Sequence, residues 1–437
     1  MKRQQLLSIL LVGWCIVIGT PTRVSAITVP DERFDYSFLE EKKEHAGDIS
    51  HLINKSLDTL GTLIKENPNN IDLHIALATN YNDIGKHTKA LKTIEDALKI
   101  DDENSAVYLQ LGNTYELLGE KDKALAAYTR MVNVDFLNEK NHLRLGVCYL
   151  KRNQAILAKK EFKKTIEINQ TIAEAYYYLG LIYLYEEEYE KALQNYLKVV
   201  QHDGSFYQAY NNIAIILLDR QGEREAIINL KNALTIYPQY DLGNFNLGKI
   251  YLKKGYYANA RDRLELSLVS NPRREKAYYL LGMTYEQSGN IEQAIYTFRK
   301  LMNQNPQNWH YKLILARLYS KTRAHQTAVQ LYADAIRNRD NVQGNVLVEY
   351  GKILERLKQN RNAEQAFKTA IEQNPQYTKA HFSLFSHYMK RFMVFQAIPE
   401  LLQSGNYLYS SLIIIALVAI FFVVVCLALK ILFLHHY

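Results

Sequence analysis

Small residues recur along most of this chain at intervals of 34 residues, with one interval of 35. They are Ala78, Gly112, Gly146, Gly180, Ala214, Gly248, Gly282, Ala316 and Gly351. An alanine follows each of them by 12 residues, and a large apolar residue follows each alanine by 4. These large residues are Ile94, Tyr128, Phe162, Tyr196, Leu230, Leu264, Phe298, Tyr332 and Phe367. The spacing lacks the alternation of strands and predicts pairs of helices that cross closely at the small residue.

This pattern resembles the tetratricopeptide repeat, whose 34-residue unit is a helix, a tight turn and a second helix. The resemblance covers roughly residues 70–404. It implies an all-α fold, an α-solenoid of about nine to ten helix-turn-helix repeats with a concave face built from the first helices. The tight turns are expected at glycines. These are Gly85, Gly119, Gly222, Gly255 and Gly289.

Two features depart from the family pattern. The family's tryptophan early in the first helix is replaced by tyrosines such as Tyr108, or by polar residues such as His142 and Asn244. We therefore expect some hairpin interiors to pack less tightly. In the tenth hairpin, Pro399 should disturb the second helix because proline removes a backbone hydrogen bond.

The N-terminus predicts a secretory signal peptide. Lys2 and Arg3 precede an apolar stretch, and small residues stand before Ala26, where a signal peptidase could cut. An uncleaved N-terminal anchor is the alternative. In either case, the residues that follow are expected outside the cytoplasm, in the periplasm or a lumen.

The C-terminus predicts a transmembrane helix, because Leu412–Leu429 contains no charged residue. The chain is therefore expected to be a single-pass membrane protein that contacts the membrane through residues 408–434. The predicted organisation is a signal peptide, an N-terminal capping helical region, a repeat solenoid and a C-terminal anchor. Their limits are 1–26, 27–69, 70–404 and 405–437.

Catalytic chemistry has no support in the sequence, which lacks G-x-S-x-G, phosphate-loop, H-E-x-x-H and paired C-x-x-C motifs. Cys148 is interpreted as a small buried hydrophobe rather than a reactive thiol. We therefore expect no enzyme activity, no cofactor and no metal. Residues 27–407 carry 49 basic and 45 acidic residues, so 49 − 45 gives a charge of only +4, which does not indicate nucleic-acid binding.

The predicted partner-binding groove follows the exposed side of the first helices. Its middle is aromatic and its later part is mostly basic, which favours protein or peptide partners with acidic and aromatic groups. The alternative is that the tyrosines only pack between helices and the lysines only solubilise the surface. Asn212 and Asn246 resemble asparagines that hold an extended peptide backbone in some family members. The predicted groove residues are Tyr177, Tyr185, Asn212, Phe245, Asn246, Lys249, Lys253, Lys276, Tyr279, Arg317, Lys321 and Lys352.

The leading functional hypothesis is a non-catalytic protein–protein interaction scaffold, anchored in a membrane with its repeats outside the cytoplasm, that assists assembly of an envelope complex. This hypothesis depends on family analogy. One alternative is a non-catalytic subunit of a glycosyltransferase or polysaccharide-export machine. Another is a tail-anchored organelle receptor facing the cytosol, which requires that the N-terminus is not a signal.

Overall fold

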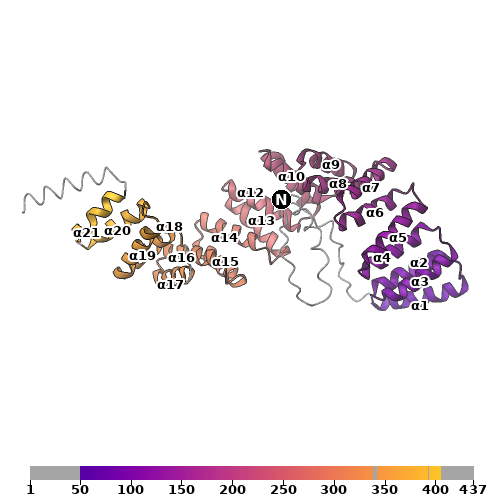
Figure 1. Ribbon diagram of the computed structural model, residues 1–437, viewed down its shortest axis with the longest axis horizontal. Coiled ribbons are helices and arrows are strands. Elements are labelled where there is room, and N and C mark those ends of the chain that lie inside the picture. The colour runs from indigo at the N-terminus through magenta and orange to yellow at the C-terminus, as the bar shows by residue number, and fades with distance from the viewer. Residues whose placement is uncertain (1–49, 338–341, 392, 405–437) are drawn as a thin grey trace, which may run out of the picture. The chain divides into compact units, whose positions relative to one another are not determined.

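The computed structural model describes residues 50–337, 342–391 and 393–404, and the chain forms two compact units (Figure 1). The N-terminal unit is Met1–Leu247 and the C-terminal unit is Gly248–Tyr437. The described residues form 21 helices and contain no strand. The predicted all-α class is therefore confirmed for the part of the chain that the structure describes.

In the described residues of the N-terminal unit there are eleven whole helices, and the twelfth crosses the end of the unit. Their bounds are α1 Ser50–Glu66, α2 Ile71–Asp83, α3 His87–Ile100, α4 Ser105–Leu117, α5 Lys121–Val134, α6 Glu139–Lys151, α7 Ala155–Ile168, α8 Ala173–Tyr185, α9 Tyr189–His202, α10 Tyr207–Asp219, α11 Glu223–Ile236 and α12 Asp241–Lys253.

The C-terminal unit continues with helices of similar lengths until its last hairpin. Their bounds are α13 Tyr257–Ser270, α14 Glu275–Gln287, α15 Ile291–Gln304, α16 Trp309–Lys321, α17 His325–Ile336, α18 Gly344–Arg356, α19 Asn360–Gln373, α20 Thr378–Lys390 and α21 Val394–Gln403.

Consecutive helices pair into hairpins, and the hairpins stack in chain order within each unit (Figure 1). The even-numbered helices from α2 to α20 are the first helices of these hairpins, and the following odd-numbered helices are the second. Second helices also pack against the next first helix, as α5 does with α6 and α15 with α16. This is the repeat arrangement that the 34-residue spacing predicts.

The close crossing inside each hairpin explains the small residues on the first helices. A Cβ atom added to Gly146 would lie 2.6 Å from Cε1 of Phe162, and one added to Gly351 would lie 2.5 Å from Cε1 of Phe367. The rings of Phe162 and Phe367 are fully buried. The small residue therefore makes room for the aromatic ring of its own hairpin, so the repeated core consists of these crossings.

Four of the five predicted turn glycines occupy the left-handed position of their turns, and the fifth, Gly222, does not. Gly85 has a φ of 73°, in the left-handed region that glycine adopts readily. Gly222 instead has a φ of −80° and caps α11, while the preceding Gln221 takes the left-handed position with a φ of 63°. Gly222 therefore lies one residue after the left-handed position that glycine occupies in the other four turns.

Polar residues at the start of the first helices make hydrogen bonds rather than loosening the hairpins. His142 is 2% exposed; its Nε2 donates to the carbonyl of Phe136 at 2.9 Å, and its Nδ1 lies 2.7 Å from the carboxylate of Glu161. Asn244 Nδ2 donates to the carbonyl of Pro238 at 2.9 Å. Each side chain ties its helix to the loop before it, so the expected loss of packing is not found at these two positions.

His381 in α20 repeats the arrangement of His142. Its Nε2 donates to the carbonyl of Pro375 at 2.9 Å, and its Nδ1 lies 2.6 Å from Glu400 on α21. Pro399 lies within α21, which runs from Val394 to Gln403 and is shorter than the other second helices. The proline therefore does not stop the helix, and the neighbouring Glu400 attaches it to α20.

The predicted localisation as a single-pass membrane protein is corrected by the lengths of the helices. Over residues 50–337, 342–391 and 393–404, no helix combines the length and the apolar character needed to cross a membrane. The longest of them, α1, has 17 residues, whereas a crossing needs about 20. The segments predicted as a signal peptide, at 1–26, and as an anchor, at 405–437, lie outside the described residues.

Candidate partner-binding site

The predicted groove residues of the N-terminal unit are mostly buried. Tyr177 on α8 and Asn212 on α10 are 0% exposed, and Phe245 and Asn246 on α12 are 2% exposed. Tyr185, at the end of α8, is half-buried, and burial raises the pKa of its phenol. Their roles in binding a partner stay predictions.

Two kinds of contact hold these side chains. The ring of Tyr177 lies 5.2 Å from the ring of Phe206, centroid to centroid. Asn246 Nδ2 donates to Oδ1 of Asn211 at 2.8 Å, and Asn211 Nδ2 donates to Oδ1 of Asn212 at 3.2 Å. The structure thus brings the two predicted asparagines together through Asn211, which joins α10 to α12.

The predicted residues of the C-terminal unit lie at its surface. Lys249, Lys253, Lys276 and Lys352 are exposed, and the ring of Tyr279 is 37% exposed. These five positions are spread over α12, α14 and α18, so they do not form one compact cluster.

Arg317 and Lys321, both on α16, are engaged in ion pairs. Nε of Arg317 donates to Glu349 on α18 at 2.7 Å, and the hydroxyl of Tyr332 donates to the same carboxylate at 2.9 Å. Nζ of Lys321 donates to Glu286 on α14 at 2.6 Å. The positive charges of these two predicted groove residues are therefore partly neutralised by carboxylates of neighbouring first helices.

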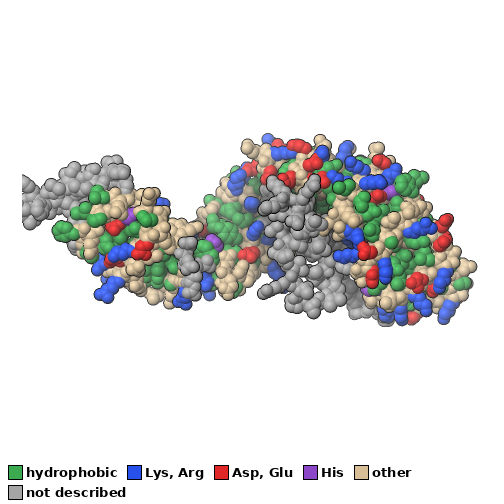
Figure 2. All heavy atoms as spheres, in the orientation of Figure 1, with side chains coloured by type: hydrophobic (Ala, Val, Ile, Leu, Met, Phe, Trp, Pro, Cys, Tyr) green, Lys and Arg blue, Asp and Glu red, His purple; other side chains and the backbone are tan. Residues whose placement is uncertain are grey.

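Ion pairs between consecutive first helices recur with a spacing of 35 residues. Lys151 pairs with Glu116 at 3.3 Å, Lys321 with Glu286 at 2.6 Å, and Lys390 with Glu355 at 3.1 Å. We did not predict these pairs from the sequence, although the repeated glutamate-to-lysine spacing of 35 is visible in it. In each unit, basic and acidic side chains lie interspersed on the face that Figure 2 shows.

A cavity of about 470 Å³ opens between α18 and α20 in the C-terminal unit. Basic side chains from both helices line it together with the ring of Phe382, which is 41% exposed and lies 6.0 Å from the ring of Phe385. The basic residues are Lys352, Arg356, Lys390 and Arg391. Of the predicted groove residues, Lys352 alone lines this cavity.

The charges around this cavity are only partly balanced. Glu355 accepts from Lys390 at 3.1 Å and lies 2.6 Å from Nδ1 of His387, while Arg391 lies 3.6 Å from Glu364. Lys352 and Arg356 have no carboxylate within ion-pair distance among the residues that the structure describes. The cavity thus offers two uncompensated cations beside an accessible aromatic ring, which suits an acidic segment with an apolar side chain.

Cys148 is 4% exposed, and burial raises the pKa of its thiol to about 11. It therefore behaves as the small buried residue that the sequence predicts. Within residues 50–337, 342–391 and 393–404, no group of three or more His, Cys, Asp or Glu side chains is arranged to hold a metal ion.

Family comparisons match four stretches of the chain to sequence profiles described as tetratricopeptide repeat. The matched residues are 75–135, 173–206, 275–308 and 345–377. No curated protein matches the chain.

Solved structures with similar chains include YrrB, MamA and PilF. YrrB, described as a TPR protein with an unusual peptide-binding site, is 22% identical over 42% of this chain and 95% of its own, with a TM-score of 0.35. MamA is 25% identical over 39% of this chain and 92% of its own, with a TM-score of 0.34. PilF of Pseudomonas aeruginosa is 18% identical over 51% of this chain and 98% of its own, with a TM-score of 0.43. At these scores the likenesses carry no argument about function.

Proposed function

This chain belongs to the tetratricopeptide repeat family, and on that premise we propose that it is a non-catalytic scaffold that binds segments of partner proteins between α18 and α20. Protein binding is the general role of such repeats. One observation carries the choice of site: the cavity where the half-exposed ring of Phe382 lies beside the uncompensated charges of Lys352 and Arg356.

The partner segment in this proposal is acidic and carries one large apolar side chain. The apolar side chain packs on Phe382, because contact with an aromatic ring removes both surfaces from water. A carboxylate of the segment lies near Lys352 and Arg356 and replaces the water around them. The exposed Lys249, Lys253 and Lys276 then act at longer range by raising the rate of encounter.

We also propose that residues 70–404 form the repeat solenoid and that residues 27–69 form a helical region that caps it. Support for the capping region comes from α1, which packs against α2, as a helix covering the first hairpin would.

Binding of labelled peptides to the full chain tests this function. The probes are short fluorescein-labelled peptides, one with glutamates around a phenylalanine, one with the phenylalanine replaced by glycine, and one with lysines in place of the glutamates. Fluorescence anisotropy gives the dissociation constants. The proposal predicts that the first peptide binds most tightly and that Phe382→Ala weakens it about tenfold or more.

The matched control is Tyr296→Ala. Tyr296 is an aromatic residue on the second helix α15 and is 66% exposed. This variant should bind the acidic aromatic peptide like the wild type. Equal affinity for all three peptides, or equal losses in the two variants, would overturn the assignment of this cavity.

A further inference from the structure

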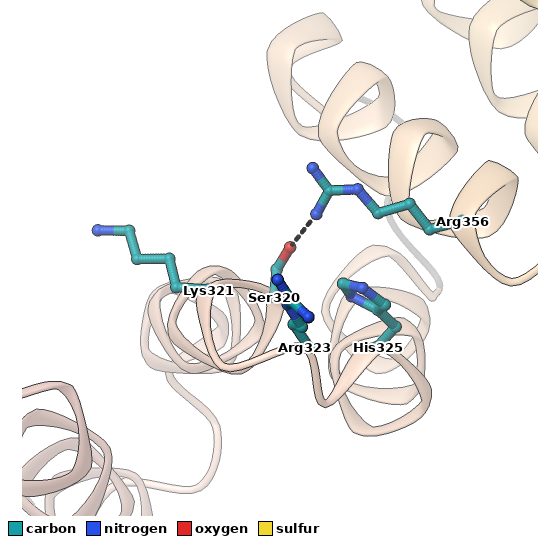
Figure 3. Close-up of a pocket in the computed structure, with 5 residues that line it drawn as sticks. All are labelled: Ser320, Lys321, Arg323, His325 and Arg356. Carbon is teal, nitrogen blue, oxygen red and sulfur yellow. Dashed lines mark hydrogen bonds between the residues drawn. The ribbon is translucent and has the colours of Figure 1, made fainter.

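A second cavity of the C-terminal unit, which shares only Arg356 with the proposed peptide site, is almost entirely basic. It has a volume of about 500 Å³ and lies where α16 ends, the turn to α17 begins and the end of α18 approaches (Figure 3). Its lining residues are Ser320, Lys321, Arg323, His325 and Arg356. No carboxylate lines it, in contrast to the cavity between α18 and α20, which Glu355 also lines.

Two guanidinium groups supply the uncompensated charge. Nη1 of Arg356 donates to Oγ of Ser320 at 3.4 Å, so the side chain reaches from α18 to the end of α16 (Figure 3). Arg323 stands in the turn, and neither arginine has a carboxylate within ion-pair distance in the part of the chain that the structure describes. Lys321 differs, because it pairs with Glu286 and points away from the other four residues in Figure 3.

His325, which also lines this cavity, has one unsatisfied polar atom. Its Nδ1 is buried and has no hydrogen-bond partner among the described residues. A buried nitrogen without a partner is costly, and a turn of the ring toward the cavity would let Nδ1 meet an anion there. His325 is also the first residue of the twelve-residue helix α17, whose N-terminal end carries partial positive charge.

The donor set favours a phosphate group over a single carboxylate. A phosphate monoester carries nearly two negative charges and three acceptor oxygens. Two guanidinium groups, an imidazole and a hydroxyl supply enough donors for these three oxygens, and guanidinium groups bind phosphate by paired hydrogen bonds. The volume exceeds that of a phosphate group alone, so the group can be carried by a larger molecule.

We propose that the cavity formed by Ser320, Arg323, His325 and Arg356 is a phosphate-monoester binding site. The site is independent of the peptide site between α18 and α20, apart from Arg356, which lines both cavities. A phosphorylated side chain of a partner protein and a free phosphate compound share this chemistry.

The test measures binding of inorganic phosphate and of a short phosphoserine peptide flanked by glycine and alanine to the full chain, by calorimetry at constant ionic strength. The wild type should bind at least one of the two saturably and should not bind the unphosphorylated peptide. Tighter binding of the phosphopeptide would identify a protein source, and equal binding would identify a free phosphate compound.

Arg323→Gln should reduce phosphate binding about tenfold because it removes one charged donor. Lys358→Gln is the matched control: Lys358 has the same left-handed backbone in the next hairpin turn, with a φ of 60° against 63° for Arg323, and does not line the cavity. Absence of saturable phosphate binding, or equal losses in both variants, would overturn the proposal. Phe382→Ala should leave phosphate binding unchanged, which separates failure of this site from failure of the peptide site.

Discussion

The interior crossings of the hairpins differ in their variability from the solvent-exposed surface of the first helices α16, α18 and α20, which we call their outer side. At the crossings, the same pair of a small residue and a large apolar one recurs from the first hairpin to the ninth. On the outer side, the chemistry changes from one helix to the next, from Arg317 bound to Glu349 to the exposed Phe382. The crossing has no room for variation because both partners are buried, whereas the outer side can vary without breaking the stack. The difference places the fold in the crossings, and we propose that recognition lies on the outer side.

The largest effect is expected from filling a crossing. Gly146→Leu should lower the free energy of unfolding by about 3 kcal/mol, since even a Cβ atom would lie 2.6 Å from the ring of Phe162. Thermal unfolding followed by circular dichroism measures the change.

Gly61→Leu in α1 is the control, because a Cβ atom there meets nothing within 4 Å. Unfolding temperatures that fall equally for the two variants would show that the crossing is not the constraint.

A smaller loss is expected from the buried histidines that tie the first helices to their loops. His142→Ala leaves the carbonyl of Phe136 without its donor and the carboxylate of Glu161 without its partner, which should cost about 1–3 kcal/mol. His142→Asn should recover part of the loss, because Asn244 makes the equivalent bond to Pro238 in its own repeat. Chemical denaturation compares the variants, and an asparagine variant no more stable than the alanine variant would contradict this role.

The crossings could be predicted from the sequence, but the ties of His142 and His381 could not. Residues equivalent to Gly146, Ala158 and Phe162 occur in each of the nine aligned repeats, so their spacing alone identifies them. Among the residues that the structure describes, the pairing of His142 with Glu161 occurs again only as His381 with Glu400, at the same spacing of 19, and two examples do not stand out in a sequence.

The site was harder to predict than the fold. The helical pattern of the sequence indicates on which side of its helix a residue lies, but it does not indicate whether neighbouring helices bury that residue. It placed Tyr177 and Phe245 on an open face, yet both are buried in the structure. It counted Arg317 and Lys321 as part of a basic surface, yet each pairs with a carboxylate about one repeat away. It did not include Phe382, whose importance depends on the cavity that α18 and α20 form together.

The smallest effect on stability is expected from the ion pairs on the outer side. Glu286→Gln removes the partner of Lys321, whose side chain is 54% exposed, so the loss should be at most about 1 kcal/mol and should shrink in high salt. Denaturation at low and high salt checks this. A loss as large as that of Gly146→Leu would mean that the outer side is structural.

The central claim is that recognition belongs to the outer side of the first helices, and charge reversal tests it most directly. Lys352→Glu changes an exposed residue of the cavity between α18 and α20, and Arg299→Glu makes a similar reversal at an exposed residue of the second helix α15. The measurement is the dissociation constant of the glutamate–phenylalanine peptide for both variants at low and high salt. We predict that Lys352→Glu weakens binding about fivefold or more at low salt and less at high salt, and that Arg299→Glu leaves it unchanged. Binding that is lost in Arg299→Glu and retained in Lys352→Glu would contradict the account.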